Sequence, residues 1–401
     1  MSDRALSERA LILLLAAVTA AGPVSLNIYM PVVPLARAAF GVSVAAASTS
    51  VTAPLIAFAI GLFVYGPLSD HYGRRPVILV GLGIYLAGLV VALTAPTMAI
   101  LTLGRVIAAL GTSAGVTVAR AAMSDLFTRD KMARKLASLT MVMVMGNALA
   151  PALGGALAQA FGWRAVFVLL LLTALLITVA AWRLLPETRG DIRGRGAREV
   201  LGATLTLLRL PLFVGNALQG AVIYAMFFVF IALMPYVFRA LGHSPSEYGL
   251  WYLGIPAGCL VGNWCVSTYA YRVGVQRLLA GGIAIQAIAA AAAWGCALAG
   301  LWHPFWLFAP WVVIGFGQSL ALPALTANAV SLAPEHGGTA SGLLGFGQQM
   351  VGALAVQAMA LRSTADPIAV SAFVAGAALF GLAAFWVGPR IPIAPQVPAA
   401  G

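Results

Sequence analysis

Charged residues gather in the segment 66–76, which reads GPLSDHYGRRP. Asp70 and Arg74 are four residues apart, a spacing at which opposite charges attract each other along a helix. Gly73 permits a left-handed turn, and Pro76 suits the first turn of a following helix because its missing N–H is harmless there. The chemistry that this pattern predicts is ion pairing at a tight connection between two helices.

A second chemical feature is an arginine inside an apolar run whose middle carries no acid. Arg105 lies about eight residues inside its run, where a charged side chain costs about 2.5–3.5 kcal/mol. The side chain must therefore face protein or water, or reach the nearer interface. None of the eleven acids lies in the middle of an apolar run: they are Asp3, Glu8, Asp70, Asp125, Asp130, Glu187, Asp191, Glu199, Glu247, Glu335 and Asp366.

The composition excludes a soluble enzyme and a nucleic-acid-binding protein. Of the 401 residues, 62% are hydrophobic and 8% are charged, whereas a soluble domain carries about 25% charged residues. Cys259, Cys265 and Cys296 form no CxxC pair, and no cluster of metal ligands or Ser/His arrangement is present. We therefore expect no cofactor, no metal and no enzymatic activity.

The elements that must position these residues are membrane-spanning helices. A span needs about 20 apolar residues, and the runs are too long for transmembrane strands. Twelve runs meet this length, at about 10–33, 44–68, 76–95, 97–122, 136–160, 163–185, 211–238, 246–269, 277–299, 303–330, 339–361 and 367–388. We predict an all-α integral membrane protein with twelve transmembrane helices.

The basic residues predict the orientation, because loops on the cytoplasmic side are enriched in Lys and Arg. With the N-terminus inside, 17 of the 23 fall on the cytoplasmic side, four fall opposite, and Arg105 and Arg120 lie within a span. We expect both termini in the cytoplasm and a multi-pass protein of the bacterial inner membrane. The longest loop predicts three parts: a six-helix half at 1–185, a cytoplasmic linker at 186–210 and a second six-helix half at 211–401.

The two halves repeat each other. Gly73 follows the second run as Gly274 follows the eighth, 201 residues later, and Arg105 is mirrored by Trp311 at an offset of 206. Repeated halves with the same orientation are typical of one large class of transporters.

Three motifs resemble those of the major facilitator superfamily. The segment 66–76 resembles its motif A, with Gly66, Asp70, Gly73, Arg74 and Arg75 at the matching positions. Leu103–Gly104–Arg105 resembles motif B, an arginine inside the membrane. The fifth run resembles motif C, the mark of exporters, with Ala150 where that motif prefers glycine; the matching residues are Gly146, Pro151, Gly154 and Gly155.

A finer resemblance is to the bicyclomycin/chloramphenicol-resistance branch of drug exporters. The segments 26–31, 119–127 and 335–342 carry it. The resemblance implies a charge cluster of Asp70, Arg74 and Asp125, which Arg120 can join, and it implies packing of span five on span eight and of span two on span eleven. Asn27 stands where that branch usually has an aspartate, and this departure puts proton coupling in question, since a carboxylate is the usual intramembrane proton carrier.

We therefore predict a secondary exporter of small, partly hydrophobic organic molecules that works by alternating access. Polar and aromatic residues at mid-depth are the candidates for the substrate cavity: Asn27, Tyr29, Arg105, Asn147, Asn216, Gln219, Tyr224 and Phe228. For each of them, hydrogen bonding between helices is about as plausible as substrate contact. The expected partners are the substrate, the lipid bilayer and a coupling proton, with no nucleic acid, and the chain is expected to be a monomer.

Other functions remain open at this point. A metabolite or nutrient importer could use the same scaffold, while a membrane enzyme or a channel lacks the residues that it would need. We also expect Gly154 and Gly258 to form the contact between the two halves, because small residues let helix backbones approach closely.

Overall fold

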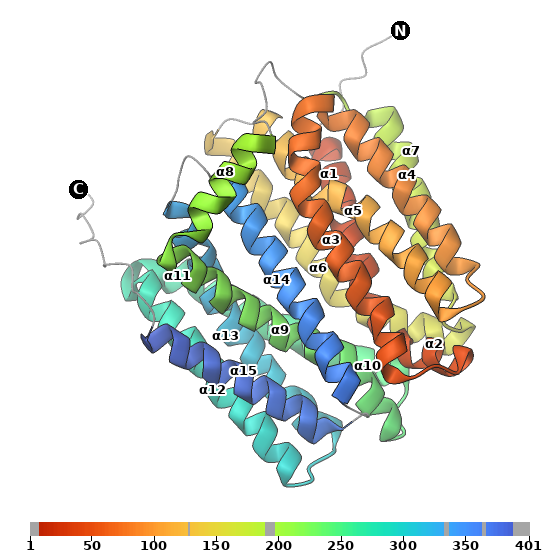
Figure 1. Ribbon diagram of the computed structural model, residues 1–401, viewed down its shortest axis with the longest axis vertical. Coiled ribbons are helices and arrows are strands. Elements are labelled where there is room, and N and C mark those ends of the chain that lie inside the picture. Colours follow the sequence, from red (N-terminus) through yellow and green to blue (C-terminus); the bar gives the residue numbers. More distant parts are fainter. Residues whose placement is uncertain (1–7, 127–128, 189–196, 333–336, 363–365, 388–401) are drawn as a thin grey trace.

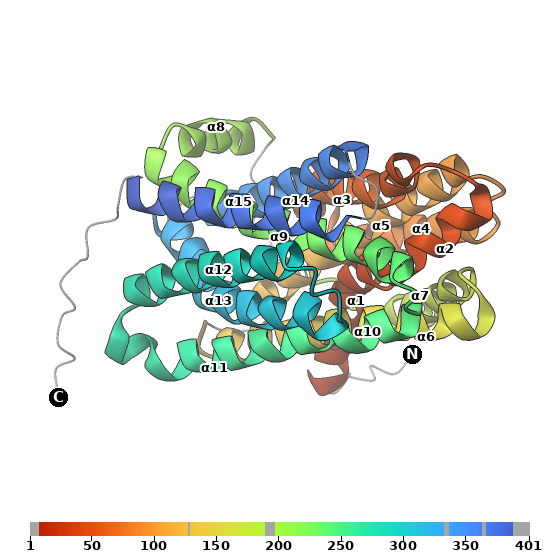
Figure 2. The ribbon, with the colours of Figure 1, turned by 90° about the horizontal axis from the view of Figure 1, so that it is seen from below.

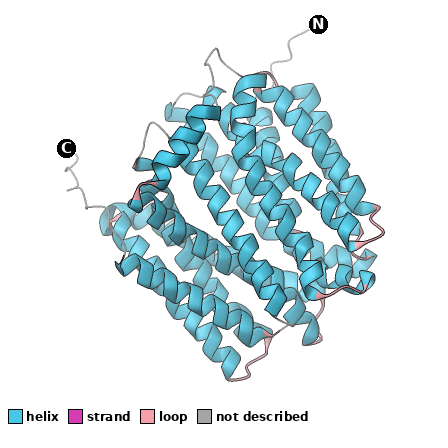
Figure 3. Cartoon of the chain, in the orientation of Figure 1, coloured by secondary structure: helices cyan, strands magenta, loops and turns pink. Residues whose placement is uncertain are grey.

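The computed structural model describes residues 8–126, 129–188, 197–332, 337–362 and 366–387. In this part of the chain every regular element is helical (Figure 3). Eleven helices are long and apolar enough to cross a membrane. They include α3 (Val44–Tyr72), α4 (Arg74–Leu93), α5 (Met98–Leu126), α6 (Arg129–Phe161), α7 (Ala165–Leu184), α9 (Pro211–Ala240), α12 (Val275–Leu298), α13 (Pro304–Ser331), α14 (Gly337–Arg362) and α15 (Pro367–Val387).

The first span is longer than the sequence predicts. Helix α1 (Glu8–Asn27) continues through a short 3-10 turn, η1 (Met30–Val32), into α2 (Val33–Phe40). Together they give a 31-residue apolar stretch, Ala10–Phe40. Pro31 lies at the start of η1 and Pro34 at the start of α2. Each ring removes a backbone N–H, which favours a change of helix type over a straight α-helix.

The eighth predicted run is divided into two helices. Helix α10 (Pro245–Tyr252) ends at Leu253, and α11 (Gly254–Val273) follows directly. Polar residues such as Asn263 make α11 less apolar than the other spans, but it still exposes Leu260 and Trp264, as a lipid-facing helix does. With α11 added to the eleven candidate spans, the described part of the chain has the twelve membrane-crossing segments that the sequence predicts.

The linker contains a helix where the sequence predicts a loop. Helix α8 (Ala197–Leu208) buries Ala203 and Leu207 and exposes Leu201 and Leu205. Leu207 packs with Phe213 and with residues of α13 and α14. Figure 2 shows α8 outside α14 and α15. Helix α8 has 12 residues, fewer than the roughly 20 that a span needs, and this is why the sequence does not predict it as a span.

Helices α1 and α3–α7 form one half of the bundle and α9–α15 form the other (Figure 1). The halves meet where α3 packs on α14 and α6 packs on α10, as the resemblance implies. We call the end of the bundle with the turns at Gly73 and Gly274 the motif-A end, and the end with Gly41 and Gly300 the far end. Gly73 has φ 100° and Gly274 has φ 90°, so the same tight turn recurs in both halves.

Candidate functional site

An ion-pair cluster joins three helices at the motif-A end. The Arg74 guanidinium, at the start of α4, donates to Asp70 of α3 at 2.5 Å and to Asp125 of α5 at 2.9 Å. It also donates to the hydroxyl of Ser69 at 2.6 Å. The structure thus brings together the three charges that the resemblance implies. All three belong to the first half, and the side chain of Arg120 lies outside the described residues.

Glu187 completes this end of the first half, and sequence reasoning missed it. Its carboxylate accepts hydrogen bonds from the backbone N–H groups of Arg74 at 2.9 Å and Arg75 at 3.2 Å. A carboxylate at a helix N-terminus satisfies unpaired N–H groups and the positive end of the helix dipole. The Arg75 side chain donates to the carbonyl of Trp182 at 2.8 Å. Glu187 therefore ties the end of α7 to the start of α4, and no local motif marks an acid that acts 113 residues away.

Arg105 is buried in the first half, and no acid of the described part of the chain lies beside it. Its side chain is 5% exposed, and it donates to the carbonyl of Ser50 in α3. The guanidinium carbon lies 3.8 Å from the centre of the Tyr29 ring, a cation–π distance. The Tyr29 hydroxyl is 3.1 Å from that of Ser50. A peptide carbonyl and an aromatic face thus hold the charge that the sequence leaves without an acidic partner.

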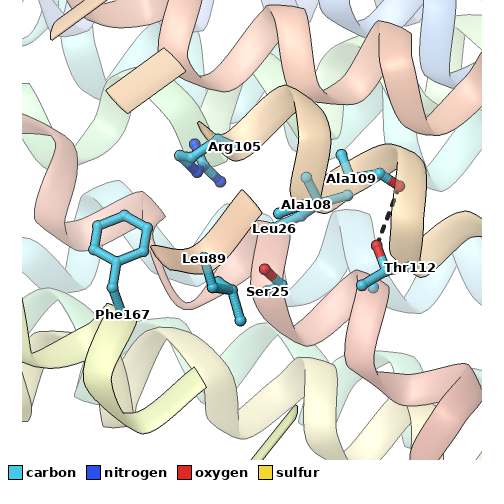
Figure 4. Close-up of a pocket in the computed structure, with 9 residues that line it drawn as sticks. Ser25, Leu26, Leu89, Arg105, Ala108, Ala109, Thr112 and Phe167 are labelled. Atoms are coloured by element: carbon cyan, nitrogen blue, oxygen red, sulfur yellow. Dashed lines mark hydrogen bonds between the residues drawn. The ribbon is translucent and has the colours of Figure 1, made fainter. Parts of the chain in front are cut away.

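The space beside Arg105 is too small for a substrate. Arg105, Ser25 and Phe167 line a cavity of about 10 Å³, which is room for about one water molecule. Figure 4 shows these side chains around the same small space. In the second half, Trp311 at the matching position stacks on Phe230 at 3.9 Å. The two halves therefore have contacts at matching positions: a charged one between Arg105 and Tyr29, and an apolar one between Trp311 and Phe230.

Two of the three predicted asparagines, Asn27 of α1 and Asn147 of α6, pair with each other. The Asn27 amide donates to Asn147 at 2.5 Å and to the carbonyl of Pro23 at 3.0 Å. Asn27 is 4% exposed, and its side-chain oxygen is buried with no hydrogen-bond partner. An orphaned buried oxygen is costly, so this position can accept a further donor.

A larger cavity lies in the second half and includes one predicted residue. It has a volume of about 500 Å³, is open to its surroundings, and is lined by Tyr224, Leu322, Pro323, Thr326, Ala327, Val330 and Gln348. Ligand pockets of about 300–1,000 Å³ are typical. Thr326 and Val330 lie within five residues of the end of α13, so the cavity extends toward the motif-A end.

The remaining candidates lie around this cavity wall or in helix contacts. Phe228 is buried and packs on Tyr224, with ring centres 5.9 Å apart. Gln219 is buried beside Gly381 of α15. Asn216 donates to the carbonyl of Leu212 in its own helix at 2.7 Å. Of the eight predicted residues, Tyr224 lines the large cavity and Arg105 lines the small one.

The predicted glycine contact between the halves is wrong in its residues. A Cβ on Gly154 would meet the carbonyl of Ile28, just after α1, and one on Gly258 would meet that of Val312 in α13. The first contact lies within the first half and the second lies within the second half, so neither joins the two halves. Neighbouring residues in a helix point about 100° apart, so Gly155 faces a different neighbour from Gly154. A Cβ on Gly155 would meet the carbonyl of Pro245, which belongs to the second half.

The remaining motif C residues fit this packing. Gly146 faces α1, where a Cβ would lie 3.0 Å from a methyl of Val24, and Pro151 stands inside α6. A Cβ on Gly249 of α10 would lie 2.6 Å from Ala152. Motif C therefore places α6 against α1 and α10 together.

Polar contacts also join the halves at the far end. Thr52 of α3 donates to Gln357 of α14 at 3.0 Å, and Gln357 donates to the carbonyl of Ala45 at 3.4 Å. The start of α10 is fixed there by a capping box of Ser244 and Glu247. The backbone N–H of Ser244 and the ring of His243 lower the pKa of the Glu247 carboxyl. The far end is thus closed by α3 with α14 and by α6 with α10.

Twelve membrane-crossing segments in two halves around an open cavity are typical of membrane transporters. Residues 13–356 match the family model described as Major Facilitator Superfamily. The chain therefore belongs to the major facilitator superfamily, and it is a multi-pass membrane protein that transports small molecules.

Its relatives include drug-resistance proteins. The chain is 27% identical to Multidrug resistance protein D of Escherichia coli, over 85% of this chain and 86% of that protein. It is 27% identical to the Chloramphenicol resistance protein of Pseudomonas aeruginosa, over 94% of this chain and 90% of that protein. The predicted resemblance to drug exporters is confirmed.

A solved structure has the same fold. The inward-facing, unoccupied structure of a bacterial homologue of the human lysosomal transporter Spinster aligns with a TM-score of 0.71 at 18% identity, over 94% of both chains. At this identity the likeness concerns the fold.

Proposed function

We propose that the chain exports small, partly hydrophobic organic molecules by alternating access, as a secondary transporter of the drug-efflux type. The observation that carries this proposal is the cavity of about 500 Å³ lined by α9, α13 and α14. Its wall combines apolar residues with a phenol, a hydroxyl and an amide, the mixture that small organic ligands require. The names of the drug-resistance relatives support the same substrate type.

The closed far end and the cavity near the motif-A end fit one state of the cycle. We propose that the motif-A end faces the cytoplasm, because the Lys and Arg residues concentrate at that end. The structure then corresponds to the inward-facing state, in which a substrate enters from the cytoplasm. The contacts of Gln357 and Gly155 would open when the halves rock to release the substrate outside.

The same assignment gives the location and the organisation of the chain. We propose a monomer in the bacterial inner membrane, with both termini in the cytoplasm and no enzymatic turnover. The functional parts would be a first half at 1–185, a cytoplasmic linker at 186–210 and a second half at 211–401. The ion pairs of Arg74 would make the motif-A end of the first half a rigid unit and steady the outward-facing state.

The coupling ion would be a proton, but the pH gradient should drive export weakly. Asn27 cannot carry a proton where the related exporters have an acid, and arginine does not release one at working pH. Proton exchange would then fall to acids at the rim, such as Asp70 and Asp125, or to the substrate itself.

Asn27→Asp should strengthen proton coupling, because it restores a carboxylate that can load and release a proton inside the membrane. The measurement is transport in proteoliposomes across an imposed pH step. Asn216→Asp is the control, since it adds an acid near the start of α9 instead. A wild type with steep proton dependence that Asn27→Asp leaves unchanged would contradict this assignment.

A drug-susceptibility panel tests the export proposal in cells. In a pump-deficient host, the chain should raise the inhibitory concentration of several neutral antibiotics by about four-fold. This corresponds to about 0.8 kcal/mol in the free energy of the drug's concentration difference across the membrane. An uncoupler should reduce this protection only in part, because the pH gradient is expected to drive export weakly. Increased sensitivity to the same drugs would favour an importer.

A further inference from the structure

We propose that the transported molecules are neutral, and that the chain discriminates against permanent organic cations. This inference rests on the proposed export function and narrows its substrate class. Three observations carry it: where the acids lie, how Arg105 is held, and which side chains line the large cavity.

Acids are confined to the ends of the helices. Among the described helices that can cross the membrane, acids lie only in a first or last turn: Glu8 begins α1, Asp70 is two residues from the end of α3, Asp125 is one residue from the end of α5, and Asp130 is the second residue of α6. Asp70 and Asp125 are already paired with Arg74. A cation in the middle of the membrane therefore meets no free carboxylate in the described part of the chain.

The charge that is buried inside the first half has the wrong sign for a cation. Arg105 is buried without an acidic neighbour among the described residues, held by the Ser50 carbonyl and the Tyr29 ring. Charges interact strongly at low dielectric, so an uncompensated guanidinium repels a second cation in the same bundle. Because the guanidinium lines a space for about one water, it does not offer an anion site of substrate size either.

The wall of the large cavity supplies hydrogen bonds and apolar contact without charge. Tyr224, Thr326 and Gln348 are its polar members, and Leu322, Pro323, Ala327 and Val330 complete it. The Thr326 hydroxyl donates to the carbonyl of Leu322 at 2.9 Å, so it faces a ligand as an acceptor. Phe228 extends the aromatic surface behind Tyr224.

This wall can hold a neutral aromatic molecule, but it cannot repay the hydration that a cation loses. A dehydrated cation needs a carboxylate or several oriented dipoles, and a single aromatic face compensates only part of that loss. A neutral molecule with amide or hydroxyl groups loses much less hydration. We therefore expect neutral substrates to be transported about ten-fold faster than permanent cations of similar size.

Two panels of probes test this selectivity in proteoliposomes that contain the full chain. One panel holds neutral aromatic amides, including chloramphenicol, and the other holds tetraphenylphosphonium and ethidium. Transport of neutral probes with little transport of cations supports the inference. Comparable transport of both panels overturns it and leaves export intact, whereas transport of neither contradicts the export function and the inference together.

A gain of function provides the second test. Thr326→Asp places a carboxylate on the exposed cavity wall and should raise transport of tetraphenylphosphonium about ten-fold. Thr326→Asn is the matched control, because asparagine has the shape of aspartate without its charge. This variant should give no gain in transport of tetraphenylphosphonium. Equal cation transport by the wild type, Thr326→Asp and Thr326→Asn would show that charge in this cavity does not select the substrate.

Discussion

Gly155→Leu should reduce transport by about a hundred-fold, the largest effect that we expect of any single substitution, equivalent to about 2.7 kcal/mol. Even a Cβ at this position would overlap the backbone carbonyl of Pro245. A backbone atom cannot move aside as a flexible side chain can, so α6 and α10 must separate. The far end could then no longer close, and the inward-facing state would be lost.

Gly83→Leu is the matched control for this experiment. Gly83 also lies in a membrane helix, but a Cβ there meets nothing within 4 Å. Both variants are to be compared for the yield of folded protein and for transport in proteoliposomes. Normal transport by Gly155→Leu, at a folded yield equal to that of Gly83→Leu, would show that close approach of α6 and α10 is not required.

Asp70→Asn should reduce transport by about ten-fold while the protein still inserts, because it removes one of the two charge-assisted partners of Arg74. The amide keeps the shape of the side chain, so a loss of transport reports the charge. The pair is partly buried, with side chains 12% and 34% exposed, and is therefore less screened than a surface pair.

Glu199→Gln controls for the loss of one negative charge outside this cluster. Glu199 lies in the first turn of α8 and is exposed. Its substitution should leave transport within about two-fold of the wild type, as for most surface changes. If Asp70→Asn and Glu199→Gln behave alike, the ion pairs of Arg74 do not contribute to the transport cycle.

Local patterns were sufficient to predict the spans and the motif-A cluster. Apolar runs of about 20 residues can satisfy their backbone in lipid only as helices, and Asp70 and Arg74 are close in sequence because they lie on either side of one turn. The pairing of Asp125 with Arg74 came from the resemblance. These features depend on short-range spacing or on a shared motif, and both are visible in one sequence.

Features that depend on three-dimensional packing were not predictable. Glu187 reaches α4 across 113 residues, and the choice between Gly154 and Gly155 as the contact to the second half depends on the rotation of α6 about its axis. The partners of Arg105 were also hidden, because a peptide carbonyl leaves no mark in a sequence. Helix α8 was missed because its 12 residues are too few to form a span.

Transport by inside-out membrane vesicles tests the central claim most directly. In such vesicles the cytoplasmic face is outside, so an exporter fills the lumen. Energised vesicles that contain the wild-type chain should accumulate labelled chloramphenicol, and vesicles that contain Gly155→Leu should not. Accumulation by right-side-out vesicles, with none by inside-out vesicles, would contradict export and assign the chain to uptake.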